Sequence, residues 1–256
     1  MKNVTAFVGS AGKKNTYRAV VQFLNNLQEL GDVETEIVML SNYRLEFCRG
    51  CRLCFEKGEA FCPLKDDRDV LFDKISASDG VVFATPNYAW DMSGMMKAFL
   101  DRFGFTLHRP RYFGKAFTSI VTQAVGRGDR IVDTLDFTAA GLGFNTLKGM
   151  TVTGFNPRTG QQQKKIDRDL ERQSRRFYAL LMRPANSAPT LLQMMVFRFG
   201  RTLVKQKADP ASLDYRYYAD RGWFEADYYC PANLGVLKKA AGYLVDSLAA
   251  VVQSFI

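Results

Sequence analysis

Short apolar runs and segments with apolar residues at helical spacing alternate along the first 183 residues of the chain. The runs are typical of strands buried in a sheet, and they cover residues 3–9, 34–40, 80–85, 115–122 and 146–154. The segments that follow them have the helical period, and they cover residues 17–30, 67–76, 92–103, 129–142 and 162–183. Because parallel strands need a crossover between them, this order predicts an open, mostly parallel α/β sheet with helices on both faces.

The pattern changes after residue 183, where no further strand is predicted. Residues 189–205 have helical spacing, and residues 209–230 are aromatic without a clear period. The last segment has apolar residues at steps of four and three, which predicts a helix with one apolar seam, formed by Leu237, Ala241, Leu244, Leu248, Val251 and Phe255. We therefore expect a sheet domain over 1–183 and a helical extension over 184–256 that packs on it or forms an oligomer interface.

Composition favours a single large core with an extension. The chain has 256 residues, of which 47% are hydrophobic, and no apolar run approaches the length of a membrane span. The N-terminus starts directly with a strand pattern and has no export signal, so we expect a soluble, cytoplasmic protein.

The positive charge of the chain is concentrated in one segment. The net charge is +9, and residues 157–207 contain 12 Lys and Arg but only three acidic residues. Such a segment can bind nucleic acid, an anionic membrane surface or the phosphates of NADPH. Because no base-stacking motif accompanies it, we favour a solvated helix face, which includes Arg198, Arg201 and Lys205 at helical spacing, and we expect no nucleic-acid partner.

The turn between the first strand and the first helix has the features of a phosphate site. A helix that starts directly after a strand points free backbone N–H groups and the positive end of its dipole at one place. Ser10, Asn15 and Thr16 add side-chain donors there, and Lys13 or Lys14 adds a charge. The alternative is an ordinary strand–helix connection in which these polar residues only cap the helix.

The loop after the third strand is suited to a flat heteroaromatic ring. Pro86 keeps the loop extended, and Asn87 and Tyr88 offer hydrogen bonds or a stacking face. The next helix starts near Ser93, and its N-terminus favours an electron-rich partner. The alternative is a surface loop whose aromatic side chains pack inward.

Four of the five cysteines lie close together in the sequence, at Cys48, Cys51, Cys54 and Cys62. Cysteines at steps of three can converge on one object when the backbone wraps around it, as it does around a [4Fe–4S] cluster. Zinc is less favoured because its sites usually combine two separated pairs. Reduced thiols or one oxidised pair remain alternatives. Cys230 has no partner in the sequence and is expected to be a buried thiol.

His108 is the only histidine. Its pKa near neutrality suits it to protonate a reduced acceptor, but we favour a structural role at the start of the fourth strand.

The combination of these motifs resembles flavodoxin-like NAD(P)H-dependent FMN reductases, and especially their iron–sulfur flavoprotein branch. The resemblance covers about residues 1–155 and is most specific between residues 48 and 102. It is carried by Gly9-Ser10 with Asn15-Thr16, the four cysteines with Asp66-Asp67, Asp79-Gly80, Thr85 to Tyr88, Ser93, Met96-Lys97 and Asp101-Arg102. It implies a flavodoxin-like three-layer sandwich with a five-stranded parallel sheet.

The resemblance also implies a cofactor and its contacts. FMN would place its phosphate at Ser10, Lys13, Asn15 and Thr16 and its ring along Pro86, Asn87 and Tyr88, near Ser93, while the loop from Thr122 to Gly126 would close the other side. Relatives often have arginine where this turn has Gly12 and glycine where it has Lys14. The four cysteines would be the ligands of a [4Fe–4S] cluster.

The implied activity is transfer of reducing equivalents from NAD(P)H through FMN to a second acceptor, by a ping-pong sequence in one site. No side chain needs to act as an acid, so no catalytic residue is predicted. An alternative is an electron carrier that passes single electrons between the cluster and FMN, with a ferredoxin-like partner. A flavin or nucleotide sensor without turnover is a third hypothesis. A homo-oligomer, dimer or tetramer, is expected.

Overall fold

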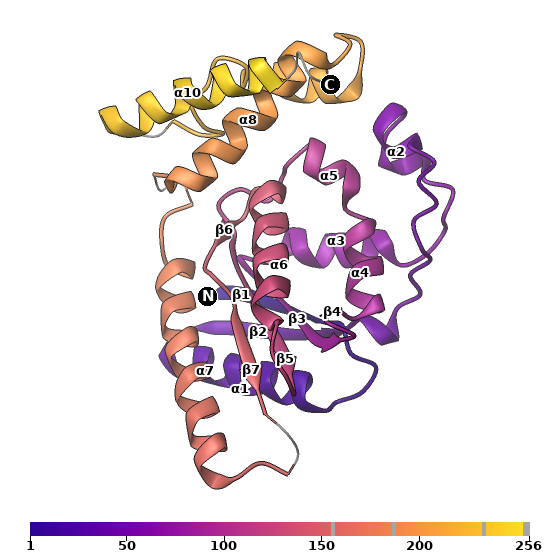
Figure 1. Ribbon diagram of the computed structural model, residues 1–256. Coiled ribbons are helices and arrows are strands. Elements are labelled where there is room, and N and C mark those ends of the chain that lie inside the picture. The colour runs from indigo at the N-terminus through magenta and orange to yellow at the C-terminus, as the bar shows by residue number, and fades with distance from the viewer. Residues whose placement is uncertain (155–156, 186–187, 232–233, 253–256) are drawn as a thin grey trace.

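The computed structural model describes residues 1–154, 157–185, 188–231 and 234–252. Strands and helices alternate through the first part as the sequence predicts, with short additional elements in the connections (Figure 1). In chain order the elements of this part are β1 (Lys2–Val8), α1 (Asn15–Leu30), β2 (Val33–Met39), η1 (Leu40–Asn42), α2 (Leu53–Glu56), η2 (Glu59–Phe61), α3 (Arg68–Ala77), β3 (Gly80–Tyr88), β4 (Asp91–Met92), α4 (Gly94–Asp101), α5 (Gly104–His108), β5 (Ala116–Gln123), α6 (Gly128–Leu142), β6 (Asn145–Thr146), β7 (Met150–Thr153) and α7 (Gly160–Leu181).

The strands form one sheet in the order β2-β1-β3-β5-β6, and β7 also pairs with β5. All of these pairs are parallel. Only β4 is antiparallel, as a short extension of β3. The two pieces β6 and β7 share the fifth position, so the order is that of flavodoxin-like folds, as expected.

The predicted fifth strand is therefore interrupted between β6 and β7. At the interruption the Gly149 N–H donates to the Asp136 carboxylate at 2.8 Å, and Ser119 Oγ donates to the same carboxylate at 2.9 Å. A Cβ at Gly149 would lie 1.9 Å from Ser119 Oγ, so only glycine fits there. At this point the backbone N–H of the fifth strand is directed toward the half-buried Asp136 side chain of α6 and not toward the neighbouring strand.

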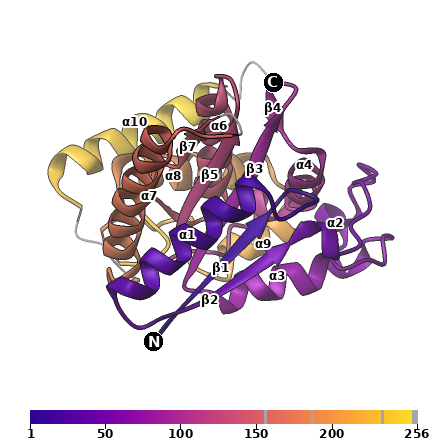
Figure 2. The same cartoon turned by 90° about the horizontal axis from the view of Figure 1, so that it is seen from below.

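Two apolar layers cover the two faces of the sheet, and successive residues of each strand alternate between them. Helices α1 and α7 cover one face, and α3, α4 and α6 cover the other (Figure 2). The first layer includes Val4, Ala6, Val8, Phe23, Leu27, Val82, Ala84, Ile120, Leu170 and Phe177. The second includes Phe7, Leu71, Ile75, Val81, Phe83, Phe99, Phe117, Ile131 and Leu135.

The C-terminal extension contains α8 (Leu191–Lys207), α9 (Leu213–Ala219) and α10 (Val236–Val252). Helices α8 and α10 lie side by side at one end of the molecule (Figure 1). Arg198 and Arg201 of α8 are buried and pair with Asp246 of α10. The prediction of a solvated basic face is therefore wrong for these two arginines, because an acidic partner 45 residues or more along the chain covers them. Among the described residues, no helix is long and apolar enough to span a membrane.

The predicted apolar seam of the last helix does not face α8. Of the predicted seam, Leu237, Leu244 and Leu248 are exposed and Ala241 is half-buried, whereas Val245 and Ala249, outside the seam, are buried. The guanidinium of Arg198 explains which face of α10 is buried. It lies against Gly242, so close that a Cβ at position 242 would be 2.5 Å from Arg198 Nη1. The ion pair with Asp246 selects the face that packs. Of the other seam residues, Phe255 lies outside the described residues and the side chain of Val251 is not described.

Candidate functional site

A cleft of about 390 Å³ lies at the carboxyl ends of the parallel strands. This is the edge where ligands bind in open α/β sheets. The turn after β1, the loop after β3, the end of β5 and the link from β7 to α7 all contribute to it. Its lining residues are Ser10, Ala11, Gly12, Lys14, Asn15, Thr16, Pro86, Asn87, Tyr88, Thr122, Gln123, Ala124, Val152, Gly154 and Arg158.

The turn after β1 is held in place by hydrogen bonds of its own and by one contact across the sheet. Ser10 Oγ donates to the carbonyl oxygen of Gly12 at 3.1 Å. The hydroxyls of Thr16 and Thr122 lie 2.6 Å apart, so the start of α1 is fixed against β5. Lys14 precedes α1 and makes no side-chain cap hydrogen bond. Ser10, Thr16 and Lys14 therefore help to shape the wall of the cleft.

The two lysines of the turn have different positions. Lys14 lines the cleft. The ammonium of Lys13 lies over the ring of Tyr17, 5.3 Å from its centroid, and Lys13 is not among the lining residues. The positive charge that this turn contributes to the cleft is that of Lys14.

The loop after β3 forms the opposite wall. Asn87 Nδ2 donates to Gln123 Oε1 and to the carbonyl oxygen of Gly126, both at 3.1 Å. Tyr88 is 60% exposed at the mouth of the cleft. Gly126 thus positions Asn87 from the neighbouring loop and does not itself line the cleft.

Gln123 is a site residue that sequence reasoning missed. Its Oε1 also accepts the N–H of Gly128 at 2.8 Å, and its Nε2 donates to Thr153 Oγ1 at 3.0 Å. This one side chain connects the loops after β3, β5 and β7. Its place as the last residue of a buried parallel strand was the available signal.

Ser93 lies beneath the cleft and is not part of its lining. It is buried, it accepts the N–H of Met96 as the N-cap of α4, and its hydroxyl donates to the carbonyl oxygen of Gly9. Its backbone N–H donates to Thr85 Oγ1 at 3.0 Å. Ser93 therefore joins the ends of β1 and β3 and positions both walls from below.

The four clustered cysteines line a second cavity, of about 80 Å³, at the C-terminal end of α4. Cys54 belongs to α2, and Cys48, Cys51 and Cys62 lie in the loops around α2 and η2. All four are free thiols, and burial raises the pKa of Cys54. Among the described residues, no three Cys, His, Asp or Glu side chains converge closely enough to hold a single metal ion. A cluster of several atoms is larger than one ion, and four thiols around one cavity fit that donor set.

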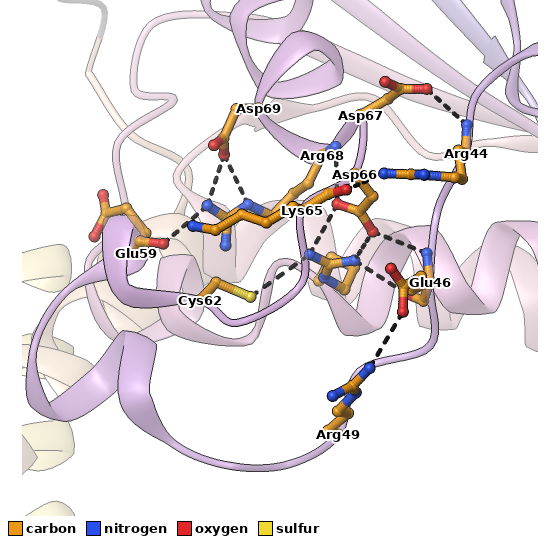
Figure 3. A network of polar contacts seen from close by, with 11 residues as sticks. Arg44, Glu46, Arg49, Glu59, Cys62, Lys65, Asp66, Asp67, Arg68 and Asp69 are labelled. Carbon is orange, nitrogen blue, oxygen red and sulfur yellow. Dashed lines mark hydrogen bonds and ion pairs between the residues drawn. The ribbon is translucent and has the colours of Figure 1, made fainter.

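A buried ion pair fixes the cysteine segment to α4. Arg102 and Asp66 are 2% and 0% exposed, and Arg102 Nη2 donates to Asp66 Oδ1 at 3.1 Å. Asp66 Oδ2 also accepts the N–H of Glu46 at 2.8 Å (Figure 3). Burial alone would raise the pKa of Asp66, but these hydrogen bonds outweigh it and hold the pKa below its usual value. Arg102 Nη2 also lies 3.6 Å from Cys62 Sγ, as a donor to sulfur.

A second set of ion pairs connects the cysteine segment with the C-terminal extension. Arg109 Nη2 donates to the carbonyl oxygen of Cys54 at 2.7 Å, and its Nη1 donates to Asp214 of α9. His108 Nδ1 lies 2.8 Å from the same carboxylate, and its ring packs on Phe55 with 4.6 Å between centroids. These contacts of His108 are structural, and they hold α9 against the cysteine segment.

The sheet order and the cleft at the carboxyl ends of its strands define a flavodoxin-like α/β protein. A family model described as NADPH-dependent FMN reductase matches residues 2–155, more than half of the chain. The chain therefore belongs to the NADPH-dependent FMN reductase family. This membership supports FMN-dependent oxidoreduction and makes the protein an oxidoreductase.

Relatives with a similar length extend the comparison beyond the matched domain. An iron–sulfur flavoprotein of Archaeoglobus fulgidus is 28% identical over 229 residues, which are 84% of this chain and 98% of that protein. An iron–sulfur flavoprotein of Clostridioides difficile is 26% identical over 226 residues, 87% of this chain and 97% of its own. Among solved structures, an NAD(P)H:quinone oxidoreductase from Methanothermobacter marburgensis has a TM-score of 0.53 at 19% identity, over 68% of this chain and 96% of that one, and shares the fold.

Proposed function

We propose that the protein binds FMN in the cleft at the strand ends and transfers reducing equivalents from NADH or NADPH to a second acceptor. The observation that carries this proposal is the convergence of the turn after β1 with the loops after β3 and β5 on one cleft, within the segment that matches the family. The residues fit the cofactor, because the first turn is polar and basic while Pro86 and Val152 offer apolar walls.

The residues of the cleft would bind and orient the cofactor. When bound, FMN would supply the redox chemistry, since it can accept a hydride and give up the two electrons together or one at a time. The Thr16–Thr122 contact holds the start of α1 toward the phosphate, and α1 adds the positive end of its dipole. Asn87, fixed by Gln123 and Gly126, orients the ring. Tyr88 would cover the mouth of the cleft and exclude water.

An anaerobic spectrum with nucleotide titration tests this proposal. Protein purified without oxygen should show a flavin spectrum, or acquire one after addition of FMN, and NADH or NADPH should bleach it. A second acceptor such as a quinone should then restore it. Protein that binds FMN but oxidises neither nicotinamide nucleotide would contradict the reductase activity, and protein that never binds FMN would contradict the whole proposal.

A second candidate function is electron carriage through a [4Fe–4S] cluster. The four cysteines around one cavity and the names of the full-length relatives favour it. Cys48, Cys51, Cys54 and Cys62 would hold the cluster, and the hydrogen bond from Arg102 to Cys62 would influence its potential.

Iron and sulfide assays with two serine variants separate this function from the simple reductase. Anaerobically purified wild type should contain about four irons per chain. Cys51→Ser should lose most of them, whereas Cys230→Ser, which lies outside the cavity, should retain them. Wild-type protein with flavin but without iron would leave the cysteines as thiols and would rule out the electron-carrier function.

We also propose a homo-oligomer, because the exposed leucines of α10 (Leu237, Leu244 and Leu248) give the extension an uncovered apolar edge. Light scattering should then report a multiple of the 28.9 kDa chain mass. A mass equal to one chain at micromolar concentration would contradict this proposal.

A further inference from the structure

Arg158 enters the cleft from a part of the chain that sequence analysis did not connect with it. It lies in the link between β7 and α7, and it lines the cleft together with Gly12 and Lys14 of the first turn. Helices α1 and α7 cover the same face of the sheet, and both begin at its carboxyl edge. The link before α7 is therefore brought to the N-terminus of α1.

A chain of side-chain hydrogen bonds holds Arg158 in this position. Its Nη1 donates to Gln163 Oε1 at 3.1 Å, and Gln163 Nε2 donates to Asp167 Oδ1 at 2.6 Å. The same carboxylate oxygen accepts Gln22 Nε2 of α1 at 2.9 Å. The guanidinium is thus positioned by both helices, but this chain uses only one of its nitrogen atoms.

The Nε of Arg158 is buried and has no hydrogen-bond partner among the described residues. No carboxylate among the described residues forms an ion pair with the Arg158 guanidinium either. A buried donor without a partner is costly, and it calls for a ligand or an explanation. Gly154 leaves room for the side chain, because a Cβ there would lie 3.2 Å from Arg158 Nε.

The first turn has no side chain at Gly12, which lines the same cleft as Arg158. Gly12 has open space around it, since a Cβ there would meet only Lys14 Cγ, at 4.0 Å. Lys14 and the positive end of the α1 dipole are the charges already present at this end of the cleft. A planar guanidinium beside them would complete a site for a phosphate monoester, which it can contact through two N–H groups.

We propose that Arg158 binds the terminal phosphate monoester of the flavin nucleotide and adds, from the far end of the domain, a second cationic side chain beside Lys14 of the first turn. This inference rests on the proposed FMN function, and it adds a phosphate ligand outside the segment matched by the family model. It predicts discrimination between FMN and riboflavin, which differ by that phosphate alone.

Flavin titrations of Arg158→Gln and a matched control test this role. The control is Arg168→Gln, which removes an exposed arginine from α7 outside the cleft. Arg158→Gln should weaken FMN binding by about 10- to 100-fold, as expected for the loss of charge-assisted hydrogen bonds, and should leave riboflavin binding unchanged. Arg168→Gln should change neither. Equal weakening of FMN and riboflavin, or no weakening of FMN, would overturn the proposal.

A second-site variant distinguishes a phosphate contact from a structural effect. Because the space around Gly12 is open, Gly12→Arg in the Arg158→Gln background should recover most of the FMN affinity while riboflavin affinity stays constant. Failure of this rescue, with the double variant folded, would count against a charge role at this end of the cleft.

Failure of the proposed function has a different signature. In that case wild type binds neither FMN nor riboflavin. Inorganic phosphate then provides the probe: it should raise the melting temperature of wild type and of Arg168→Gln more than that of Arg158→Gln. An equal response of all three proteins would overturn the Arg158 site itself.

Discussion

The cleft at the strand ends and the cysteine cavity are built in different ways. The cleft at the strand ends is formed by loops that each follow a strand of the sheet, and neutral hydrogen bonds such as Thr16–Thr122 and Asn87–Gln123 join them. The cysteine cavity is formed by a segment with only one turn of α-helix and one of 3₁₀-helix. Buried guanidinium groups hold that segment to the rest of the molecule, Arg102 through Asp66 and Arg109 through the carbonyl oxygen of Cys54.

This difference teaches which interactions each cavity depends on. The walls of the cleft are positioned by the sheet, whose two apolar layers supply most of its stability. The cysteine segment has no strand pairing, so a few desolvated ion pairs decide its position. Single polar substitutions should therefore loosen the cysteine cavity while the cleft keeps its shape.

The largest effect is expected for Arg102→Met. Removing the guanidinium leaves the Asp66 carboxylate buried without its charged partner, and breaking such a pair costs about 3–5 kcal/mol. Urea unfolding should show this loss of unfolding free energy, and the four thiols should react faster with a disulfide reagent. Lys97→Met, which breaks the exposed Lys97–Asp101 pair on the same helix, should cost less than about 1 kcal/mol. Similar losses in the two variants would contradict the role assigned to the buried Arg102–Asp66 pair.

One carboxylate of the sheet domain and one of the cysteine segment should respond to pH in opposite directions. Burial raises the pKa of Asp136, beside the interrupted fifth strand, to about 6 from 3.8. The folded protein then holds this proton more tightly than the unfolded chain, so the unfolding free energy falls as pH rises from about 4 to 6. Asp66 has a lowered pKa, so its contribution is complete above its usual pKa and is lost as pH falls further.

The Asp136 contribution amounts to at most about 3 kcal/mol. It should be measured as the difference in unfolding free energy between wild type and Asp136→Asn, because the variant cannot titrate at this position. Between pH 4 and pH 7 the unfolding free energy of wild type should fall relative to that of Asp136→Asn. A difference independent of pH would mean that the carboxylate has an ordinary pKa.

The same contrast explains how much of the molecule could be predicted from its sequence. The parallel sheet and the edge that carries the cleft follow from local periodicity and from the crossover rule, because each strand and helix can be recognised within a short window. The flavodoxin-like strand order follows from the resemblance to the family. The loops that line the cleft follow from that order. Seven of the residues that were predicted to bind the cofactor line the cleft, namely Ser10, Asn15, Thr16, Pro86, Asn87, Tyr88 and Thr122.

The remainder depends on contacts between distant residues. Arg158 reaches the first turn only because α7 packs beside α1. Arg102 meets Asp66 across a sequence separation of 36 residues, which includes α3, β3 and α4. Arg198 is buried because Asp246 lies opposite it in α10, and this pair also turns the leucine seam outward. The periodicity of the sequence does not predict such pairs, since each depends on how two packed elements are positioned relative to one another.

The smallest effect on stability is expected for Tyr88→Ala, at the mouth of the cleft. The side chain is 60% exposed, so the unfolding free energy should change by less than about 0.5 kcal/mol. Loss of ring contact should weaken FMN and riboflavin binding alike, by about fivefold, since an aromatic pair contributes about 1 kcal/mol. Tyr88→Phe retains the ring and should retain both affinities. If Tyr88→Ala instead weakened FMN alone, the ring would lie elsewhere and Tyr88 would belong to the phosphate end, which would remove the proposed division of the cleft between Tyr88 and Arg158.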